Sequence, residues 1–468
     1  MKRAGDSTPR AMIPPAAMLL RQLGIVSASA LVISNMIGAG IWTTSGILAG
    51  QLGSVRSILA IWAVGAVCAL AGAFCYSELG VNFPSSGGEY VYLSEAFGPT
   101  WGFMTGWVSF FAGFSAPIAA AALAFSDYLG RFLPAFALEN SHHLFGSGPR
   151  EFRFGVPQAA ACAVIAVFTI VNCLGVKLSA GIQNVLTVLK VSVIAAFLAA
   201  GFGFGAGDWA NFSHAATRTS STPMPAQFVV SLLLIYLGYS GWNAATYIAE
   251  ELRHPARTLP YSLACGTLLV AALYIGLNVL FIYAVPLESM KGVVAIGSLA
   301  ATHLFGPAVA RAFGIAMMLS LLATINAEVT IGPRVYYAMA KNGAFFTAAS
   351  KVHPSWHTPA VAIVCQGVCS MVMTMTPFVE LLLYIGFLLN FFAVLSVASL
   401  FLFRRRAGWT RLAVVSFAYP LIPLFFILVG VGMTIFGITY RPATAFIAIL
   451  TLAAGAIVYH LRLRSRSA

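Results

Sequence analysis

The chain has 468 residues, of which 60% are hydrophobic and only 8% are charged, and its mean hydropathy is +0.89. A soluble domain carries roughly 25% charged residues, so this composition excludes a soluble protein and predicts an all-α polytopic membrane protein. The formal net charge of +13 does not indicate nucleic-acid binding, because the sequence offers no soluble basic domain to carry it.

Apolar runs of about 20 residues recur along the whole chain, and each can cross a hydrocarbon core of about 30 Å. We predict twelve transmembrane helices, at 24–49, 57–80, 101–133, 156–175, 180–205, 227–249, 261–285, 308–338, 359–376, 378–403, 411–436 and 442–463. An even number of spans leaves both termini on one side. That side then holds seventeen Lys and Arg residues and the other side eight, so the positive-inside bias predicts cytoplasmic termini in a plasma (inner) membrane protein.

Small residues interrupt two of these spans. The first span contains Asn35-Met36-Ile37-Gly38-Ala39-Gly40-Ile41-Trp42, and the sixth contains Leu237-Gly238-Tyr239-Ser240-Gly241-Trp242-Asn243. An opened backbone inside a bilayer is tolerated only where it lines a cavity. Paired breaks in two halves of a chain indicate the substrate site of a carrier, although small residues also serve close helix packing.

The breaks predict a substrate with two opposite charges. The half-helix that resumes after Gly40 presents free N–H groups and a positive dipole end, which suit an anion. The half-helices that end at Ile37 and near Tyr239 leave carbonyls unpaired, and these suit an ammonium group. A carboxylate beside an ammonium describes the α-carbon end of an amino acid.

The positions of the breaks also predict the domain organisation. With breaks in spans one and six, spans one to five and six to ten form two repeats, and an odd number of helices inverts the second repeat across the membrane. We therefore expect a cytoplasmic N-terminal segment (1–23), a first inverted repeat (24–205), a second inverted repeat (227–403), two further helices (411–463) and a cytoplasmic tail (464–468).

Four motifs in this order resemble the amino acid–polyamine–organocation transporters, and most of all the L-type amino acid transporters and their bacterial relatives. They are Asn35 to Trp42, the loop Ser85-Ser86-Gly87-Gly88-Glu89-Tyr90-Val91-Tyr92, Gly241-Trp242-Asn243 through Glu250-Glu251, and Ile325-Asn326 with Pro333-Arg334-Val335-Tyr336-Tyr337. The resemblance covers nearly the whole chain. It implies the leucine-transporter fold with discontinuous helices 1 and 6, and amino acid transport by alternating access.

The resemblance also implies a substrate site on the broken helices. The backbone at Ile37, Gly38, Ala39 and Gly40 is expected to hold the α-carboxylate and part of the amino group. Carbonyls around Leu237, Gly238 and Tyr239 complete the ammonium site, and Asn243 belongs to the same motif. Leu237 stands where L-type members often have an aromatic gate, which weighs against large aromatic substrates.

Lys190 is a charge in the middle of the fifth span, where an ionisable group is a functional hypothesis by default. It lies about ten residues, or some 15 Å of helix, from the near end of the span, too far for snorkelling. In the resembled family a fifth-helix lysine takes the place of a sodium ion and contacts helices one and eight. We therefore expect sodium-independent transport.

Glu328 and Asn326 lie in the eighth span and are candidates for selectivity or support. Glu328 could pair with Lys190, face the pocket and select a cationic side chain, or sit in a hydrated cleft. We expect neutral amino acids as substrates, with a cationic amino acid or polyamine carrier as the alternative. Exchange, uniport and proton symport stay open.

The remaining residue patterns favour a carrier over other classes. A membrane enzyme would need a nucleophile–base pair or a metal cluster, and a channel would not need paired breaks; neither a cofactor nor a metal is expected. The seven cysteines fall inside apolar spans and behave as small hydrophobes. Eukaryotic L-type members join a heavy subunit through a loop cysteine between helices three and four. Residues 134–155 contain no cysteine, so we expect no disulfide-linked partner.

Overall fold

The computed structural model describes residues 19–130, 132–145, 151–293, 295–376, 378–440 and 442–463. Most of the predicted N-terminal segment (1–23) and the whole predicted tail (464–468) lie outside the described residues.

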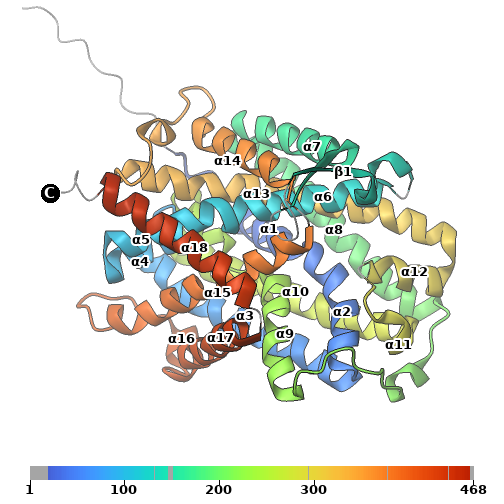
Figure 1. Cartoon of the computed structure of the whole chain (residues 1–468). Coiled ribbons are helices and arrows are strands. Elements are labelled where there is room, and N and C mark those ends of the chain that lie inside the picture. Colours follow the sequence, from blue (N-terminus) through green and yellow to red (C-terminus); the bar gives the residue numbers. More distant parts are fainter. Residues whose placement is uncertain are drawn as a thin grey trace, which may run out of the picture.

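Helices account for most of the chain (Figure 1). The first part contains α1 (Ile25–Met36), α2 (Ala39–Leu52), α3 (Val55–Asn82), α4 (Glu89–Phe97), α5 (Pro99–Val108), η1 (Ser109–Ser115), α6 (Ala116–Gly130), η2 (Pro134–Phe136), η3 (Leu138–Asn140), β1 (Ser141–Phe145), β2 (Phe152–Gly155), α7 (Val156–Cys173), α8 (Val176–Phe204) and η5 (Trp209–Ser213). The second part contains α9 (Met224–Tyr239), η6 (Ala244–Glu251), α10 (Pro255–Ala284), α11 (Leu287–Met290), α12 (Ile296–Phe305), α13 (Pro307–Lys341), η7 (Thr347–Ser350), α14 (Ala360–Met373), α15 (Phe378–Phe403), α16 (Ala413–Ser416), α17 (Leu421–Tyr440), α18 (Pro442–Val458) and η8 (Tyr459–Leu463).

The apolar spans predicted from the sequence appear as helices in the predicted order. Within the described ranges, ten helices are long and apolar enough to cross a membrane. The predicted ninth and twelfth spans correspond to the shorter apolar helices Ala360–Met373 and Ala445–Leu461. The predicted eleventh span begins late, at Leu421 rather than at 411, because Pro420 and Pro423 fit only the start of a helix.

Two small features depart from a purely helical prediction. Strands β1 and β2 form an antiparallel hairpin between α6 and α7. The short helices α4 and α12 end at Phe97 and Phe305, and in both cases a glycine follows and a proline begins the next helix. Gly98 and Gly306 both have positive φ, of 93° and 83°, a conformation that glycine adopts without steric cost.

Both predicted breaks are present in the backbone. Helix α1 ends at Met36, the chain is non-helical at Ile37 and Gly38, and α2 begins at Ala39. Helix α9 ends at Tyr239, and the 3₁₀ helix η6 begins at Ala244. Between them Gly241 has φ 101°, which favours glycine.

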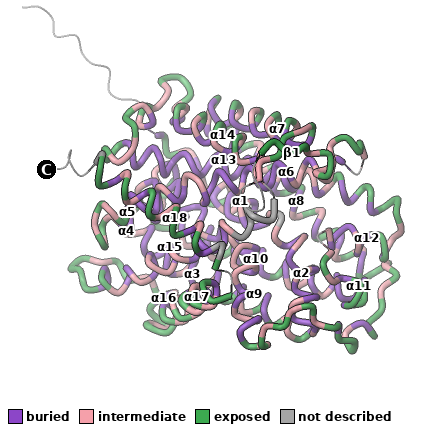
Figure 2. The backbone as a smooth tube through the Cα atoms, viewed as in Figure 1, coloured by how far each residue is buried: buried purple, intermediate pink, exposed green. Residues whose placement is uncertain are grey.

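The two broken helices lie at the centre of the bundle. Helix α1 packs against α8, α10 and α13, and α9 packs against α2, α3 and α15. Buried residues run through the central helices, whereas exposed residues concentrate on loops and on the outer faces of helices such as α17 and α18 (Figure 2). Many of those exposed residues are large and apolar, for example Leu421, Leu428 and Ile435 of α17, as expected for a surface that faces lipid.

Candidate functional site

The two breaks are in direct contact with each other. A Cβ atom placed on Gly40 would lie 2.6 Å from the Cα of Gly238. A Cβ atom on Gly241 would lie 2.6 Å from the Oδ1 of Asn35, in the last turn of α1. Because carbon atoms normally approach no closer than about 3.5 Å, only glycine permits this spacing at either place.

One cavity opens between the two breaks, and we call it the α2–α9 cavity. The space between protein atoms there, including the part open to solvent, is about 550 Å³. Its lining combines both breaks with α6, α13 and α15: Asn35, Met36, Gly38, Gly40, Pro117, Ala120, Ala121, Leu237, Ser240, Thr324, Glu328 and Ile385. The first turn of α2 therefore borders a cavity with N–H groups that lack intrahelical acceptors.

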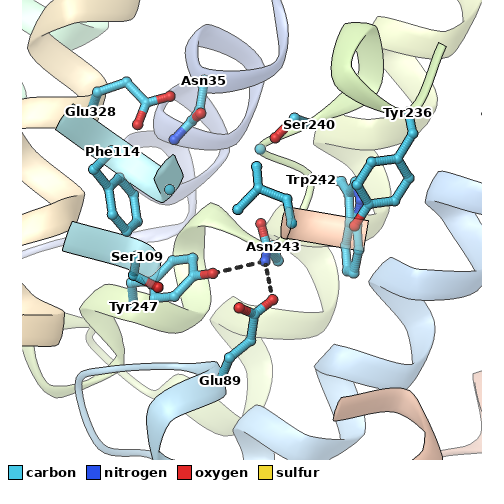
Figure 3. A pocket seen from close by; sticks show the side chains of 13 residues that line it. Asn35, Glu89, Ser109, Phe114, Tyr236, Ser240, Trp242, Asn243, Tyr247 and Glu328 are labelled. Atoms are coloured by element: carbon cyan, nitrogen blue, oxygen red, sulfur yellow. Dashed lines mark hydrogen bonds between the residues drawn. The ribbon is translucent and has the colours of Figure 1, made fainter. Parts of the chain in front are cut away.

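A second cavity, the α4–η6 cavity, adjoins the first; its space between protein atoms, including the part open to solvent, is about 450 Å³. Asn35, Ser240 and Glu328 line both cavities. The rest of its lining is more polar and comes from α4, α9, η6, α15 and the π-helical segment η1: Glu89, Ser109, Gly113, Phe114, Tyr236, Gly241, Trp242, Asn243, Tyr247 and Leu389 (Figure 3). Single π-helical turns occur often at functional sites.

The expectation for the Ile37 carbonyl is wrong. This carbonyl is not unpaired, since it accepts hydrogen bonds from Lys190 Nζ at 2.6 Å and from Thr324 Oγ1 at 2.9 Å. The carbonyl of the preceding Met36 accepts one from the Tyr274 hydroxyl at 2.6 Å. The end of α1 thus already has protein donors and does not present these oxygens to an ammonium group.

Lys190 is buried and meets oxygen atoms only. Its Nζ donates to the carbonyls of Ser34 (3.2 Å) and Ile37 (2.6 Å) and to Thr324 Oγ1 (3.0 Å). These partners belong to α1 and α13, the first and eighth predicted spans. Lys190 therefore ties the fifth span to the end of the first half-helix, next to the break.

Glu328 faces both cavities instead of pairing with Lys190. Its Oε2 is buried without a hydrogen-bond partner. Among the ion pairs of the described residues, none includes Glu328. Of the three roles open for Glu328 in the sequence, pairing with Lys190 is excluded by this geometry.

Asn326 lies close to Glu328 in the chain but points elsewhere. It accepts from Asn172 Nδ2 at 3.0 Å and donates to the Ser179 carbonyl at 3.2 Å and to Gln183 Oε1 at 2.8 Å. These contacts join α13 to α7 and α8, away from both cavities. Asn326 thus supports the bundle and does not line either cavity.

The predicted residues of the second break divide between different surroundings. Leu237 lines the α2–α9 cavity, whereas Asn243 lines the α4–η6 cavity. Gly238 faces Gly40 and Trp62. Tyr239 is buried, and its hydroxyl donates to the Trp62 carbonyl at 3.1 Å. Of these four residues, only Leu237 and Asn243 border either cavity.

One end of the bundle, which we call the N-terminal face, is closed by a buried ion pair. Arg334 donates to Glu251 at 2.7 and 3.3 Å, and both side chains are about 1% exposed. The backbone N–H groups of Gln22 and Leu23 also donate to the Glu251 carbonyl. The start of the described chain, η6 and α13 therefore meet at this face.

Glu89 is a cavity residue that sequence reasoning missed as a site, since it was noted only as part of a loop motif. Tyr76 Oη donates to its carboxylate at 2.6 Å. Asn243 Nδ2 also donates to it, at 3.1 Å (Figure 3). Burial raises the pKa of Glu89 to about 7, although hydrogen bonds from Tyr76, Tyr247 and Asn243 act to lower it. The contact joins residues 154 positions apart, which no local pattern reveals.

Metal chemistry has no evident centre in this region. In the part of the chain that the structure describes, no group of three His, Cys, Asp or Glu residues could hold a metal ion.

Comparisons with known proteins agree with this architecture. The serine/threonine exchanger SteT of Bacillus subtilis (strain 168) is 29% identical over 413 residues, which cover 87% of this chain and 88% of that protein. The b(0,+)-type amino acid transporter 1 of Mus musculus is 28% identical over 450 residues, covering 95% and 88%. The large neutral amino acids transporter small subunit 2 of Rattus norvegicus is 26% identical over 469 residues, covering 98% and 84%.

The relatives are transporters and not enzymes. The model of the amino acid permease family matches residues 23–458, which is nearly the whole chain. Together with two broken helices around a cavity, this match identifies the chain as a member of the amino acid permease family.

Proposed function

We propose that this permease carries amino acids across the membrane by alternating access and without sodium. The observation that carries the proposal is the α2–α9 cavity, because both breaks border it and the first turn of α2 faces it. The α-carboxylate of the substrate binds the free N–H groups after Gly38, where the helix dipole is positive.

The ammonium group of the substrate binds on the opposite side of this cavity. The Leu237 carbonyl accepts from the Ser240 N–H at 3.1 Å, so the ammonium site rests on the carbonyls of Gly238 and Tyr239, which end α9 beside Ser240. The Ile37 carbonyl is excluded from this role by its bonds to Lys190 and Thr324. The site thus depends more on the second break than the sequence suggests.

The surroundings of Lys190 support sodium independence. Two backbone carbonyls and a threonine hydroxyl are oxygen ligands of the kind that a cation prefers, and here a lysine ammonium holds them. Because Nζ of Lys190 already donates to all three oxygens, a sodium ion would have to displace it.

The contact pattern supports a twelve-helix protein with two inverted five-helix repeats. In this arrangement α1 corresponds to α9, α3 to α10, α6 to α13 and α8 to α15. The α1–α10 contact then has its counterpart in α9–α3, and the α1–α8 contact has its counterpart in α9–α15. Likewise, the α13–α8 contact has its counterpart in α6–α15. The repeated Phe-Gly-Pro between α4 and α5 and between α12 and α13 follows the same exchange. Both termini are proposed to be cytoplasmic.

Uptake of labelled amino acids into proteoliposomes tests the transport proposal. We expect saturable, stereospecific uptake of L-amino acids that is the same in sodium and in choline buffers. Strict dependence on sodium would contradict the role given to Lys190, and flux that does not saturate would indicate a channel.

Glu328 favours a second candidate, a carrier of cationic amino acids. A buried carboxylate without a partner is costly, unless it is protonated or a ligand supplies the opposite charge. The side chain of a bound lysine or arginine substrate, next to Glu328 in the wall that the two cavities share, would supply that charge. A protonated Glu328 would instead suit a neutral substrate, the class expected from the sequence.

Replacing Glu328 with Gln separates these two candidates. For a cationic carrier, Glu328→Gln reduces the uptake of L-lysine by at least about tenfold more than the uptake of L-alanine, since one buried charge pair is worth more than 1.4 kcal/mol. Equal effects on both substrates would remove Glu328 from selectivity.

The printed name of the relative from Rattus norvegicus includes the words "small subunit". For this chain we propose transport without a disulfide-linked partner. Non-reducing and reducing electrophoresis of the protein from its native membrane would test this, and a larger species that reduction removes would contradict it.

A further inference from the structure

Glu89 and Glu328 differ from the other two buried glutamates of the described chain, Glu78 and Glu251, because those two form ion pairs. Glu78 pairs with Arg404 at 2.6 Å, and Glu251 pairs with Arg334 at 2.7 Å. Glu89 is only 4% exposed, yet the ion pairs of the described residues do not include it. Its carboxylate instead accepts hydrogen bonds from Tyr76 and Asn243.

No positive charge surrounds this carboxylate within the described part of the chain. The titratable groups that face it are four tyrosines and one further carboxyl group. They are Tyr76 of α3, Tyr92 of α4, Tyr236 of α9, Tyr247 of η6 and, across the α4–η6 cavity, Glu328 of α13. A negative charge at Glu89 therefore has only neutral donors and the water of the cavity to stabilise it.

Glu89 is also connected to the broken part of the sixth span. Asn243, which precedes η6, donates to Glu89 at 3.1 Å and to the Tyr247 hydroxyl at 3.0 Å (Figure 3). Gly87 N–H donates to the Tyr247 carbonyl at 3.3 Å. A movement of η6 that opens the N-terminal face must therefore change the surroundings of Glu89.

We propose that Glu89 binds and releases the proton that this permease moves together with its amino acid, so that transport is proton symport. The proposal rests on the proposed amino acid transport and adds the coupling ion and its site. While the cavity is open, water stabilises the carboxylate. When the cavity closes around the substrate, water leaves and the carboxylate takes a proton, which it releases to water after the cavity opens on the other side.

The ionisation behaviour of Glu89 is consistent with this cycle. Its pKa of about 7 lets it gain and lose a proton near neutral pH. Glu328 lacks the hydrogen bonds to the second break that connect Glu89 with η6. Lys190 is held by three oxygen atoms away from the α4–η6 cavity.

Proton movement can be measured with the full-length protein in liposomes that contain a pH-sensitive dye. L-serine, L-alanine, L-leucine and L-lysine are added separately as probes. We expect each transported probe to acidify the lumen. An external pH one unit lower than the internal pH should drive up to about tenfold accumulation for one proton per amino acid.

Glu89→Gln tests the assignment of the proton to this residue. Glutamine resembles the protonated acid but does not titrate, so the variant should lose lumen acidification and pH-driven accumulation, while counterflow exchange falls much less. Glu95→Gln is the matched control, because Glu95 is an exposed carboxylate on the same helix α4. This control should acidify the lumen as the wild type does.

Tyr76→Phe gives a second readout that keeps the carboxyl group. The lost hydrogen bond from Tyr76 stabilises the carboxylate, so the midpoint of the pH profile of uptake should move to higher pH. A purely structural role of Glu89 would change the rate and leave this midpoint in place.

The outcomes separate the two proposals. Absence of counterflow for all four probes in the wild type would overturn amino acid transport itself. Counterflow without lumen acidification, or full acidification by Glu89→Gln, would overturn only the coupling role of Glu89. Should Glu89→Gln fail to fold, as judged by size-exclusion chromatography, an unchanged midpoint in Tyr76→Phe would overturn that role.

Discussion

At the scale of single residues, Lys190 shows how a buried amine is held by oxygen atoms alone. Its Nζ donates to two carbonyls and one hydroxyl. If the lysine were removed, the carbonyls of Ser34 and Ile37 would share the Thr324 hydroxyl as their remaining side-chain donor. The side chain therefore maintains the geometry of the first break.

Lys190→Ala should reduce transport much more than it reduces the amount of folded protein. The loss of the Lys190 donor from the carbonyls of Ser34 and Ile37 should disorder the break, and we expect uptake to fall by at least about tenfold, the equivalent of 1.4 kcal/mol. The measurement is uptake per folded molecule in proteoliposomes. Lys177→Ala, an exposed lysine on the same helix, is the control and should transport normally. Equal losses of uptake and of folded protein would indicate a structural role only.

Glu89 predicts a pH dependence of stability with a definite sign. Its pKa is raised from 4.5 to about 7 in the folded protein, so the folded state binds the proton more tightly than the unfolded chain. The resulting stabilisation is complete below pH 4.5 and is lost as the pH rises through 7; its upper limit is about 3 kcal/mol.

Thermal unfolding in detergent between pH 5 and pH 8 measures this effect. The wild type should lose stability toward pH 8, and Glu89→Gln should lose less over the same range because glutamine does not titrate. Identical pH profiles for the two proteins would show that Glu89 has an ordinary pKa.

The sequence identified the residues around the breaks better than their partners. Gly38, Gly40 and Gly241 indicate an opened backbone because they belong to two breaks at corresponding places in two halves of the chain. The partners of Ile37 and Glu89 lie 153 and 154 positions away in the chain. Such contacts depend on how the helices pack, and no periodicity within one helix contains that information.

At the scale of helices, the contact between α2 and α9 combines packing with function. Gly40 faces Gly238 so closely that no side chain fits between them. Both explanations of the first break therefore hold: its glycines permit close packing, and that packing brings the two half-helices to one cavity. The order of the helices was predictable from hydropathy, whereas their boundaries near Pro420 and the hairpin β1–β2 were not, because turns and prolines interrupt the apolar pattern.

Gly40→Val should abolish transport, and Gly40→Ala should reduce it. A Cβ atom 2.6 Å from the Gly238 backbone must push α2 and α9 apart, at a typical cost of about 1–3 kcal/mol for an overpacked core. Unchanged uptake by Gly40→Val would contradict the substrate site at the first break. Gly203→Ala provides the control, since a Cβ atom at Gly203 of α8 meets no atom within 4 Å. Uptake and thermal unfolding should be measured for all three variants.

At the scale of the whole molecule, two buried ion pairs among the described residues join elements that are far apart in the chain. Glu78 of α3 pairs with Arg404 after α15, and Glu251 of η6 pairs with Arg334 of α13. Closing a cavity on one side requires such reversible connections between helices that move relative to one another. Since Glu251 ends the element that begins beside Asn243, its ion pair is suited to hold the N-terminal face closed.

A double replacement can separate this gating role from stability. Glu251→Gln alone leaves Arg334 buried without its partner and should cost about 3–5 kcal/mol, seen as a lower unfolding temperature. Glu250 pairs with Lys341 at 3.7 Å, and the Lys341 side chain is 59% exposed. Glu250→Gln should therefore lower the free energy of unfolding by less than about 1 kcal/mol. Replacing both Glu251 and Arg334 with Met should restore most of the stability, because apolar side chains of similar size can fill a buried pair's place. Transport should remain impaired in this stable double variant if the pair controls opening of the N-terminal face, whereas normal transport would show that the pair serves stability alone.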